Sequence, residues 1–208
     1  MLSPAPKDVH MSSGSNFIHL HLHSQYSLLD GAVRLPDLIQ QVKAYDMPAV
    51  AVTDHGNMFG AVDFYTEAIS AGIKPILGSE VYMAPGDRRD KTKRASFHLI
   101  LLARNEEGYK NLKYLVSMAY LEGFYYRPRI DRDLLKKHSA GLIGSSACLG
   151  GEVASTFRTG GYEQAKTAAA NLAGLFEPGH FFLEIQNNGY REQPELNTAL
   201  RQIGQELN

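Results

Sequence analysis

Short apolar runs alternate with amphipathic stretches along almost the whole of this 208-residue chain. The runs have the length and the turn-rich borders of buried strands, and the stretches between them repeat apolar residues at helical spacing. We expect six strands, at about residues 17–23, 48–54, 73–83, 97–103, 141–148 and 180–186. Helices are expected at about residues 35–45, 61–70, 106–120, 131–138, 152–158, 162–176 and 192–207. This alternation predicts a parallel α/β architecture, either a closed barrel or an open doubly wound sheet.

The first expected strand is unusual because its apolar residues alternate with histidines. The run reads Ile18, His19, Leu20, His21, Leu22 and His23. Residues two apart on a strand share a face, so the three imidazoles would point to the same side. Asp30 follows in a polar loop, and imidazole beside carboxylate suits zinc, iron, nickel or manganese. The alternative is a solvated polar face with one or two structural histidines, but three histidines in register favour a metal site.

Other residues that carry chemistry follow the expected strands. Asp54 and His55 end or follow the second strand, Glu80 lies near the exit of the third, and Cys148 ends the fifth. Closed α/β barrels and open α/β sheets both build their sites at the carboxyl ends of strands. No Gly-x-Gly-x-x-Gly turn follows the first strand, and inward-facing histidines suit a barrel lumen. His98 begins a strand, so its position alone does not mark it as a site residue.

Composition excludes several classes of protein. Hydrophobic residues make up 44% and charged residues 21%, as in ordinary soluble domains. The net charge of −1 gives no evidence for a nucleic-acid partner, which only a local patch could indicate. The single cysteine excludes an internal disulfide and fits a reducing cytoplasm. No apolar run reaches transmembrane length, so no membrane is expected.

Two segments carry none of the candidate metal ligands. Residues 1–15 read as a disordered tail or a remnant of expression cloning, which leaves residues 16–208 as one domain. Residues 85–94 form a polar, mostly basic loop. A charge run without aromatic residues favours a solvated, mobile insertion, and the alternative is a contact to a nucleic-acid backbone.

The motifs that carry these residues resemble the PHP (polymerase and histidinol phosphatase) domain family. They are His21-Leu-His23-Ser24, Asp30-Gly31, Thr53-Asp-His-Gly56, Glu80, His98 and Cys148. Residues 26–31, 53–60, 72–78 and 120–131 resemble more closely the N-terminal region of bacterial DNA polymerase III alpha subunits. The likeness runs from about Phe17 to the end of the chain.

The resemblance implies a distorted seven-stranded β/α (TIM-like) barrel that holds up to three divalent metals. The implied metal ligands are His21, His23, Asp30, His55, Glu80, His98 and Cys148. His21, His23 and Glu80 would hold one metal, and Glu80 would bridge to a second.

The remaining implied ligands complete this second site and a third. His98 and Cys148 would hold the second metal, and Asp30 and His55 would serve the third. A thiolate ligand favours zinc, with manganese as the alternative. Asp54 would orient His55 or cap the following helix.

The family pattern ends in an Asp-x-His that this chain does not reach, so we expect a barrel truncated before its last strand. Its open edge would invite association with another chain. The fragment alone is expected to have an impaired site.

Three functions compete. The first is a metal-dependent 3′–5′ exonuclease domain of a replicative DNA polymerase, with Glu80, His55 and Asp54 as catalytic residues and the primer 3′ end of DNA as substrate. The resemblance implies further partners, namely the rest of the polymerase chain, a proofreading exonuclease subunit and a sliding clamp. The second function is an inactive scaffold that binds that exonuclease. The third is a free phosphoesterase resembling histidinol phosphatases. The complete set of visible ligands favours the first, and the polymerase-like stretches disfavour the third.

Overall fold

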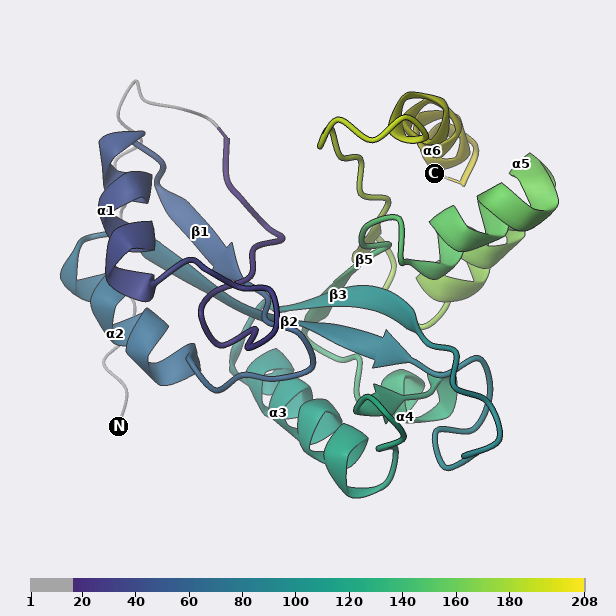
Figure 1. The fold of residues 1–208 in the computed structure, drawn as a ribbon, viewed down its shortest axis with the longest axis horizontal. Helices are drawn as coiled ribbons and strands as arrows, with labels where there is room; N and C mark the ends of the chain where they lie inside the picture. Colours follow the sequence, from purple (N-terminus) through teal and green to yellow (C-terminus); the bar gives the residue numbers. More distant parts are fainter. Residues whose placement is uncertain (1–16, 208) are drawn as a thin grey trace.

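The computed structural model describes residues 17–207, and the expected tail at residues 1–15 lies outside them. Helices and strands alternate through the described part of the chain (Figure 1). In chain order they are α1 (Leu35–Ala44), β1 (Ala49–Val52), α2 (Ala61–Ser70), β2 (Lys74–Met83), β3 (Phe97–Ala103), α3 (Glu106–Leu121), β4 (Arg129–Ile130), α4 (Arg132–Lys137), β5 (Leu142–Ser145), α5 (Glu152–Ala173), β6 (Phe181–Phe182) and α6 (Gln193–Leu207). The predicted α/β class is confirmed. None of the described helices is both long and apolar enough to cross a membrane.

The strands form one mixed sheet in the order β1-β2-β3-β5-β6, with β4 added beside β2. β1 pairs with β2, and β5 with β6, in parallel. β3 runs antiparallel to both β2 and β5, so the prediction of a wholly parallel sheet is wrong at this strand. The reason is the connection, because residues 84–96 contain no crossover helix and a parallel return requires one.

The long strand β2 joins the two halves of the sheet. Residues Lys74 to Leu77 pair with β1, and Gly78 to Met83 pair with β3. Helices α1 and α2 cover the β1 end, and α3 lies beneath the β2–β3 pair, with α5 and α6 at the far end (Figure 1). Glu80 lies three residues before the end of this strand, in the part that pairs with β3.

Residues 17–23 do not form the expected strand, and the chain bends at His21. The amides of Ala51 and Thr53 donate to the carbonyls of His19 and Leu22, each at 2.8 Å. The two acceptors, His19 and Leu22, are three residues apart, whereas the two donors, Ala51 and Thr53, are two residues apart. A regular strand ladder needs equal spacing on both sides, so it cannot form here. The segment still lies alongside β1, as Figure 1 shows at its purple end.

Other element predictions differ mainly in extent. β5 and β6 are shorter than expected, and β4 was not expected at all. The two helices expected at residues 152–176 are present as α5, which breaks at Gly161, where φ is 77°. Most other helix bounds agree within one or two residues.

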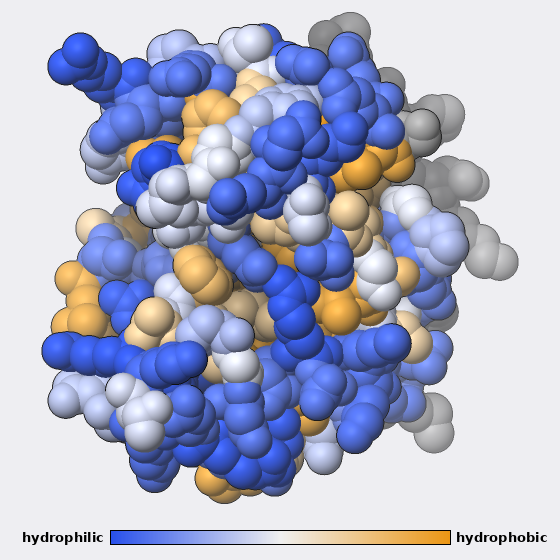
Figure 2. Space-filling model, turned by 90° about the vertical axis from the view of Figure 1, so that its right-hand side faces the viewer, coloured by the Kyte–Doolittle hydropathy of each residue, from blue (hydrophilic) through white to orange (hydrophobic). Residues whose placement is uncertain are grey.

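Three hydrophobic clusters of described residues hold the layers together. The largest joins β2 and β3 to helices α3, α4, α5 and α6, and a second joins β1 to α1 and α2. A small third cluster lies across β1 and β3 and contains Ala51, Ile100, Leu102 and Ala147. The surface on the side of α5 and α6 is mostly hydrophilic, with hydrophobic residues gathered in a band across its middle (Figure 2). Buried apolar packing therefore supports the sheet that carries Glu80 along its length.

The basic loop at residues 85–94 is anchored rather than freely solvated. Arg88 is buried and pairs with Asp131 at 2.8 Å and also with Glu122. The buried Arg129 side chain donates to three carbonyl oxygens of the loop. This contradicts the expectation of a mobile insertion, because the loop is bonded to the connector that follows α3.

Candidate metal centre

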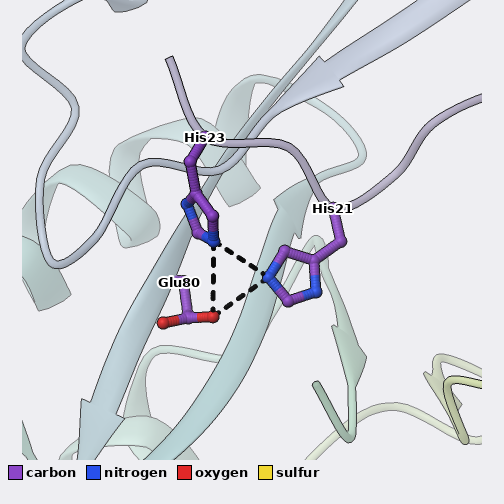
Figure 3. Close-up of side chains that lie close together, drawn as sticks. All are labelled: His21, His23 and Glu80. Atoms are coloured by element: carbon purple, nitrogen blue, oxygen red, sulfur yellow. Dashed lines mark hydrogen bonds and ion pairs between the residues drawn. The ribbon is translucent and has the colours of Figure 1, made fainter. Parts of the chain in front are cut away.

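His21, His23 and Glu80 meet above β2 (Figure 3). His21 Nε2 lies 3.2 Å from His23 Nε2 and 3.0 Å from Glu80 Oε2. His23 Nε2 lies 3.7 Å from the same carboxylate oxygen. The two histidines come from the segment at residues 17–23 and the glutamate from a strand, so three ligand atoms of one potential metal site converge from two chain segments.

The second carboxylate oxygen of Glu80 faces two further histidines. Glu80 is 1% exposed, and its Oε1 lies 2.6 Å from His55 Nδ1 and 2.9 Å from His98 Nδ1. Neither contact has acceptable hydrogen-bond geometry, so this buried oxygen has no hydrogen-bond partner among the described residues. Buried polar atoms are normally hydrogen-bonded, so a carboxylate oxygen that faces imidazole nitrogens without a well-aligned hydrogen bond suits a metal cation.

Cys148 completes the second group of potential ligands. Its Sγ lies 3.5 Å from His98 Nδ1 and accepts from the Gly150 amide at 3.4 Å. Ligand atoms of Glu80, His98 and Cys148 all lie within 4.8 Å of one another. Imidazole, carboxylate and thiolate together are a donor set that divalent metals of the zinc type prefer.

The antiparallel course of β3 explains how His98 reaches the site. His98 pairs with Tyr82, so the amino end of β3 lies beside the carboxyl end of β2. A rule that considers only carboxyl ends of parallel strands misses such a residue. Only the family resemblance identified His98 as a candidate from the sequence.

Asp30 and His55 lie at the outer side of the centre. Asp30 Oδ2 is 2.9 Å from His55 Nε2, and the His55 ring stacks on His23 with 3.9 Å between centroids. Asp30 is exposed. Within the described residues, no third ligand atom joins Asp30 and His55 in a compact group apart from the Glu80 cluster.

Asp54 acts on the loop after His23 rather than on the His55 ring. Its buried carboxylate accepts the Ser24 amide at 2.6 Å, the Ser24 hydroxyl at 2.8 Å and the Ser27 hydroxyl at 2.9 Å. The Ser27 oxygen in turn accepts the His55 amide at 3.1 Å. Asp54 therefore holds the backbone that carries the site, which neither of its two expected roles described.

His19 does not join the cluster. Its side chain is exposed and packs edge-on against the Phe17 ring, with 4.9 Å between centroids. The irregular pairing of residues 17–23 turns it away from His21 and His23.

Glu184 is a site residue that the sequence reasoning missed. His21 Nδ1 lies 2.7 Å from Glu184 Oε1, and the Ser145 hydroxyl donates to Oε2 at 2.8 Å. A carboxylate on one ring nitrogen of histidine fixes the tautomer and leaves the other nitrogen free for a metal. Glu184 lies two residues after β6, so the strand-end rule could have found it.

The sequence of the described residues matches one family model along most of its length. Residues 19–188 match the model of the PHP domain. The chain belongs to the PHP domain family. The resemblance drawn from the sequence motifs is thereby confirmed.

Curated relatives of this PHP domain are DNA polymerase III alpha subunits. The chain is 50% identical to that of Borreliella burgdorferi over 201 residues, which are 95% of this chain and 17% of the relative. It is 50% identical to the Helicobacter pylori protein, covering 88% of the chain and 16% of the relative. For Thermus aquaticus the identity is 46%, over 93% of the chain and 16% of the relative. The PHP domain thus spans about a sixth of the length of these relatives.

A solved structure shares the fold at low sequence identity. It is a protein from Bifidobacterium adolescentis assigned as a metal-dependent phosphoesterase. The TM-score is 0.55 and the identity 13%, over 94% of this chain and 85% of the other. This likeness supports the α/β fold of the PHP domain.

The charges of the metal centre of this PHP domain depend strongly on one another. Burial alone would raise the pKa of Glu80, but His21, His55 and His98 hold it well below its usual range. Burial likewise opposes protonation of His21, yet Glu184 and Glu80 raise the pKa of His21 to about 10. In the metal-free protein, protons on the imidazoles therefore balance carboxylates that cations would otherwise balance.

The thiol of Cys148 is coupled to the same charges. Burial lowers the pKa of His98, but Cys148 and Glu80 outweigh it and bring it to about 9. Burial raises the pKa of the Cys148 thiol, but His98 and the Gly150 amide outweigh this and bring it below its ordinary value. A thiol that ionises more easily is a better metal ligand.

We expect the metal-free PHP domain to lose stability as the pH rises above neutral. The pKa values of His21 and His98 rise from 6.5 to about 10 and about 9 on folding. Their stabilisation is complete below pH 6.5 and is lost as the pH rises through these folded values. Glu80 has a lowered pKa, so its stabilisation is present above 4.5 and is lost only in acid.

Thermal melting with a chelator, from about pH 6 to about pH 10, measures this dependence. A Glu80→Gln variant should show a flatter profile, because it lacks the carboxylate that raises both pKa values. A melting temperature that increases steadily over this range would contradict the assignment of these charges.

Proposed function

We propose that this PHP domain is a metal-dependent phosphodiesterase that removes nucleotides from the 3′ end of DNA. The observation that carries the proposal is the shared position of Glu80, whose two oxygens face the two groups of potential ligands. A carboxylate between two cations at short separation is what two-metal phosphoryl chemistry uses.

The chain's own residues supply two groups of three donors, which share Glu80. His21, His23 and Glu80 would hold one metal, and Glu80, His98 and Cys148 the other. Bound metals would supply activation of water and stabilisation of phosphoryl charge. We propose zinc, because thiolate and imidazole are the donors it prefers, with manganese as the alternative.

The remaining polar residues of the site have supporting roles in this proposal. Glu184 orients the His21 ring, and Asp54 fixes the turn that follows His23. Asp30 and His55 would serve a third metal at the outer side, where the site is open to solvent. His55 also packs on His23 and so keeps the two rings in place.

The relatives suggest the wider setting of the domain. We propose that it is the N-terminal domain of a DNA polymerase III alpha subunit, a DNA-directed DNA polymerase in the cytoplasm. The proposed partners are DNA, the rest of the polymerase chain, a proofreading exonuclease subunit and a sliding clamp. Identities of 46–50% to alpha subunits support this setting over a free histidinol-phosphatase-like enzyme.

Metal removal tests the proposal. Metal content and degradation of 3′-labelled single-stranded DNA would be measured on this chain and on the full-length subunit proposed to carry it. We expect bound zinc or manganese, degradation by the full-length protein, loss with a chelator and recovery on adding metal. Primer extension measured with magnesium serves as the control for polymerase integrity. Absence of degradation by the metal-loaded full-length protein would instead support the inactive scaffold.

A further inference from the structure

The connector between α3 and β4 places aromatic and arginine side chains beside the metal centre. It runs through residues 122–128 and exposes Phe124 at 49% and Tyr126 at 59% of their surfaces. Tyr126, Arg127 and Arg94 of the neighbouring loop form what we call the aromatic–arginine strip. All three side chains are exposed.

The backbone at Tyr126 is held in an unfavourable conformation. Its φ is 60°, in the left-handed region that residues with a β-carbon rarely adopt. The Tyr125 amide donates to the Arg127 carbonyl at 3.1 Å and closes a tight turn around it. An exposed tyrosine gains no core packing in exchange for this strain, and strain of this kind concentrates at functional sites.

Arg127 connects the strip to the metal centre. Its guanidinium lies over the Tyr82 ring, 4.7 Å from the centroid. The Tyr82 ring meets His98 edge-on, with 5.3 Å between centroids. Arg127 Nη1 also lies 3.4 Å from His98 Nε2, a long and weak contact. A cation is thereby fixed on an aromatic face next to a proposed metal ligand.

Packing against the turn after His55 fixes the position of this connector. Gly56 has φ of 62°, and a β-carbon there would lie 2.8 Å from Pro128 Cγ and 3.2 Å from the Tyr82 ring. The connector thus contacts directly the residue that follows His55. This packing of Pro128 against Gly56 fixes where the backbone of Arg127 lies relative to the metal centre.

The neighbouring arginines are paired with carboxylates or backbone carbonyls, whereas Arg127 and Arg94 contact tyrosine rings. Arg88 and Arg89 pair with Glu122, and Arg129 donates to backbone carbonyls. Within the described residues no ion pair with a carboxylate is formed by Arg127 or Arg94. Arg94 lies over the Tyr126 ring, 3.8 Å from the centroid. Two cations are therefore available for an anion, and each is supported by a tyrosine ring.

We propose that the aromatic–arginine strip binds the single-stranded nucleic acid whose end enters the metal centre. This inference rests on the proposed phosphodiesterase function and names residues that would bind its substrate. Arg127 contacts a phosphate, and Tyr126, backed by Arg94, stacks on a base. Stacking needs an unpaired base, so the strip fits a single strand rather than a duplex.

Metal binding by His98 is compatible with phosphate binding by Arg127. The metal would take Nδ1 of His98, and Nε2 would keep its proton, so this ring nitrogen does not compete for the Arg127 donors. The guanidinium keeps its place over Tyr82. It can then donate two hydrogen bonds to phosphate oxygens.

Binding without hydrolysis is the direct test. Fluorescence anisotropy of a 5′-labelled oligothymidylate would be recorded with the whole 208-residue chain in chelator, so that no cleavage interferes. We expect Arg127→Ala to weaken binding by about 5–20-fold and to lower the salt dependence by about one phosphate contact. Tyr126→Asn removes the ring but tolerates the left-handed backbone, and should weaken binding about 5–20-fold.

Arg104→Ala is the matched control, because this exposed arginine pairs with Glu177 away from the strip. It should bind the oligonucleotide as the wild type does, and thermal melting checks the fold of each variant. Wild-type affinity in folded Arg127→Ala and Tyr126→Asn, or no binding by the wild type, would overturn the proposal. Equal losses for duplex and single strand would also overturn it. Strand binding that depends on Arg127 and Tyr126, together with no degradation by the metal-loaded full-length protein, would refute the phosphodiesterase function and leave the strip supported.

Discussion

Glu80→Gln is expected to abolish degradation of DNA 3′ ends and to remove tightly bound metal from the domain. Both Glu80 oxygens face potential ligands, and the side chain is 1% exposed, so water cannot replace the lost charge. Glutamine keeps the shape but offers one neutral oxygen. Since loss of a group that merely orients a ligand weakens metal binding roughly 10–100-fold, loss of a shared ligand should weaken it by at least ~100-fold.

Metal content after dialysis and 3′-end degradation by the full-length protein measure these effects. Primer extension should survive, because the proposal places polymerisation elsewhere in the longer chain. Glu107→Gln makes the same chemical change at an exposed position of α3 and should alter neither property. A folded Glu80→Gln protein that still holds its metals and degrades DNA would refute the proposed centre.

Local patterns in the sequence predicted the elements that depend on local interactions. The helical spacing of apolar residues in α1 and the apolar run of β3 gave bounds that the structure confirms within one residue. The direction of β3 could not be read in this way. It depends on the path of residues 84–96 through space, and the periodicity of a strand is the same in both directions.

Site residues could be predicted from the sequence where they lie at the carboxyl end of an expected strand. The positions of Glu80 and His55 followed from that rule, whereas His98 needed the family resemblance because its strand is reversed. Glu184 also lies near a strand end, but nothing in the sequence distinguishes this acid from others until His21 is known to lie beside it. Contacts between residues 163 positions apart carry no signal in one sequence.

The hydrogen bonds that anchor the basic loop at residues 85–94 also could not be predicted, because they join residues far apart in the sequence. Arg129 reads as one more cation of a basic connector, yet it is 1% exposed. Its guanidinium donates to the carbonyls of Gly123, Lys93, Arg88 and Asp90, at 2.7–3.2 Å. The geometry shows a structural cation, which holds both segments that contribute to the aromatic–arginine strip.

Arg129→Met is expected to destabilise the fold by about 3–5 kcal/mol, because it leaves four carbonyls, two of them on buried residues, without their donor. For a domain of this size the melting temperature should fall by roughly 6 °C or more. Limited trypsin digestion should also cut sooner at Lys91 and Lys93, since the loop that carries them loses its anchor. Thermal melting and mass analysis of the digests provide the two measurements.

Arg129→Lys separates the role of the charge from that of the forked guanidinium. Lysine keeps the charge but has three donors at one point, so it cannot reach carbonyls on both segments. We expect it to lose most of the stability that the methionine variant loses. Lys110→Ala, which breaks an exposed ion pair with Glu106, should change stability by less than about 1 kcal/mol. Full stability in Arg129→Lys would show that charge alone holds the loop, and full stability in Arg129→Met would show that the four carbonyls find other donors.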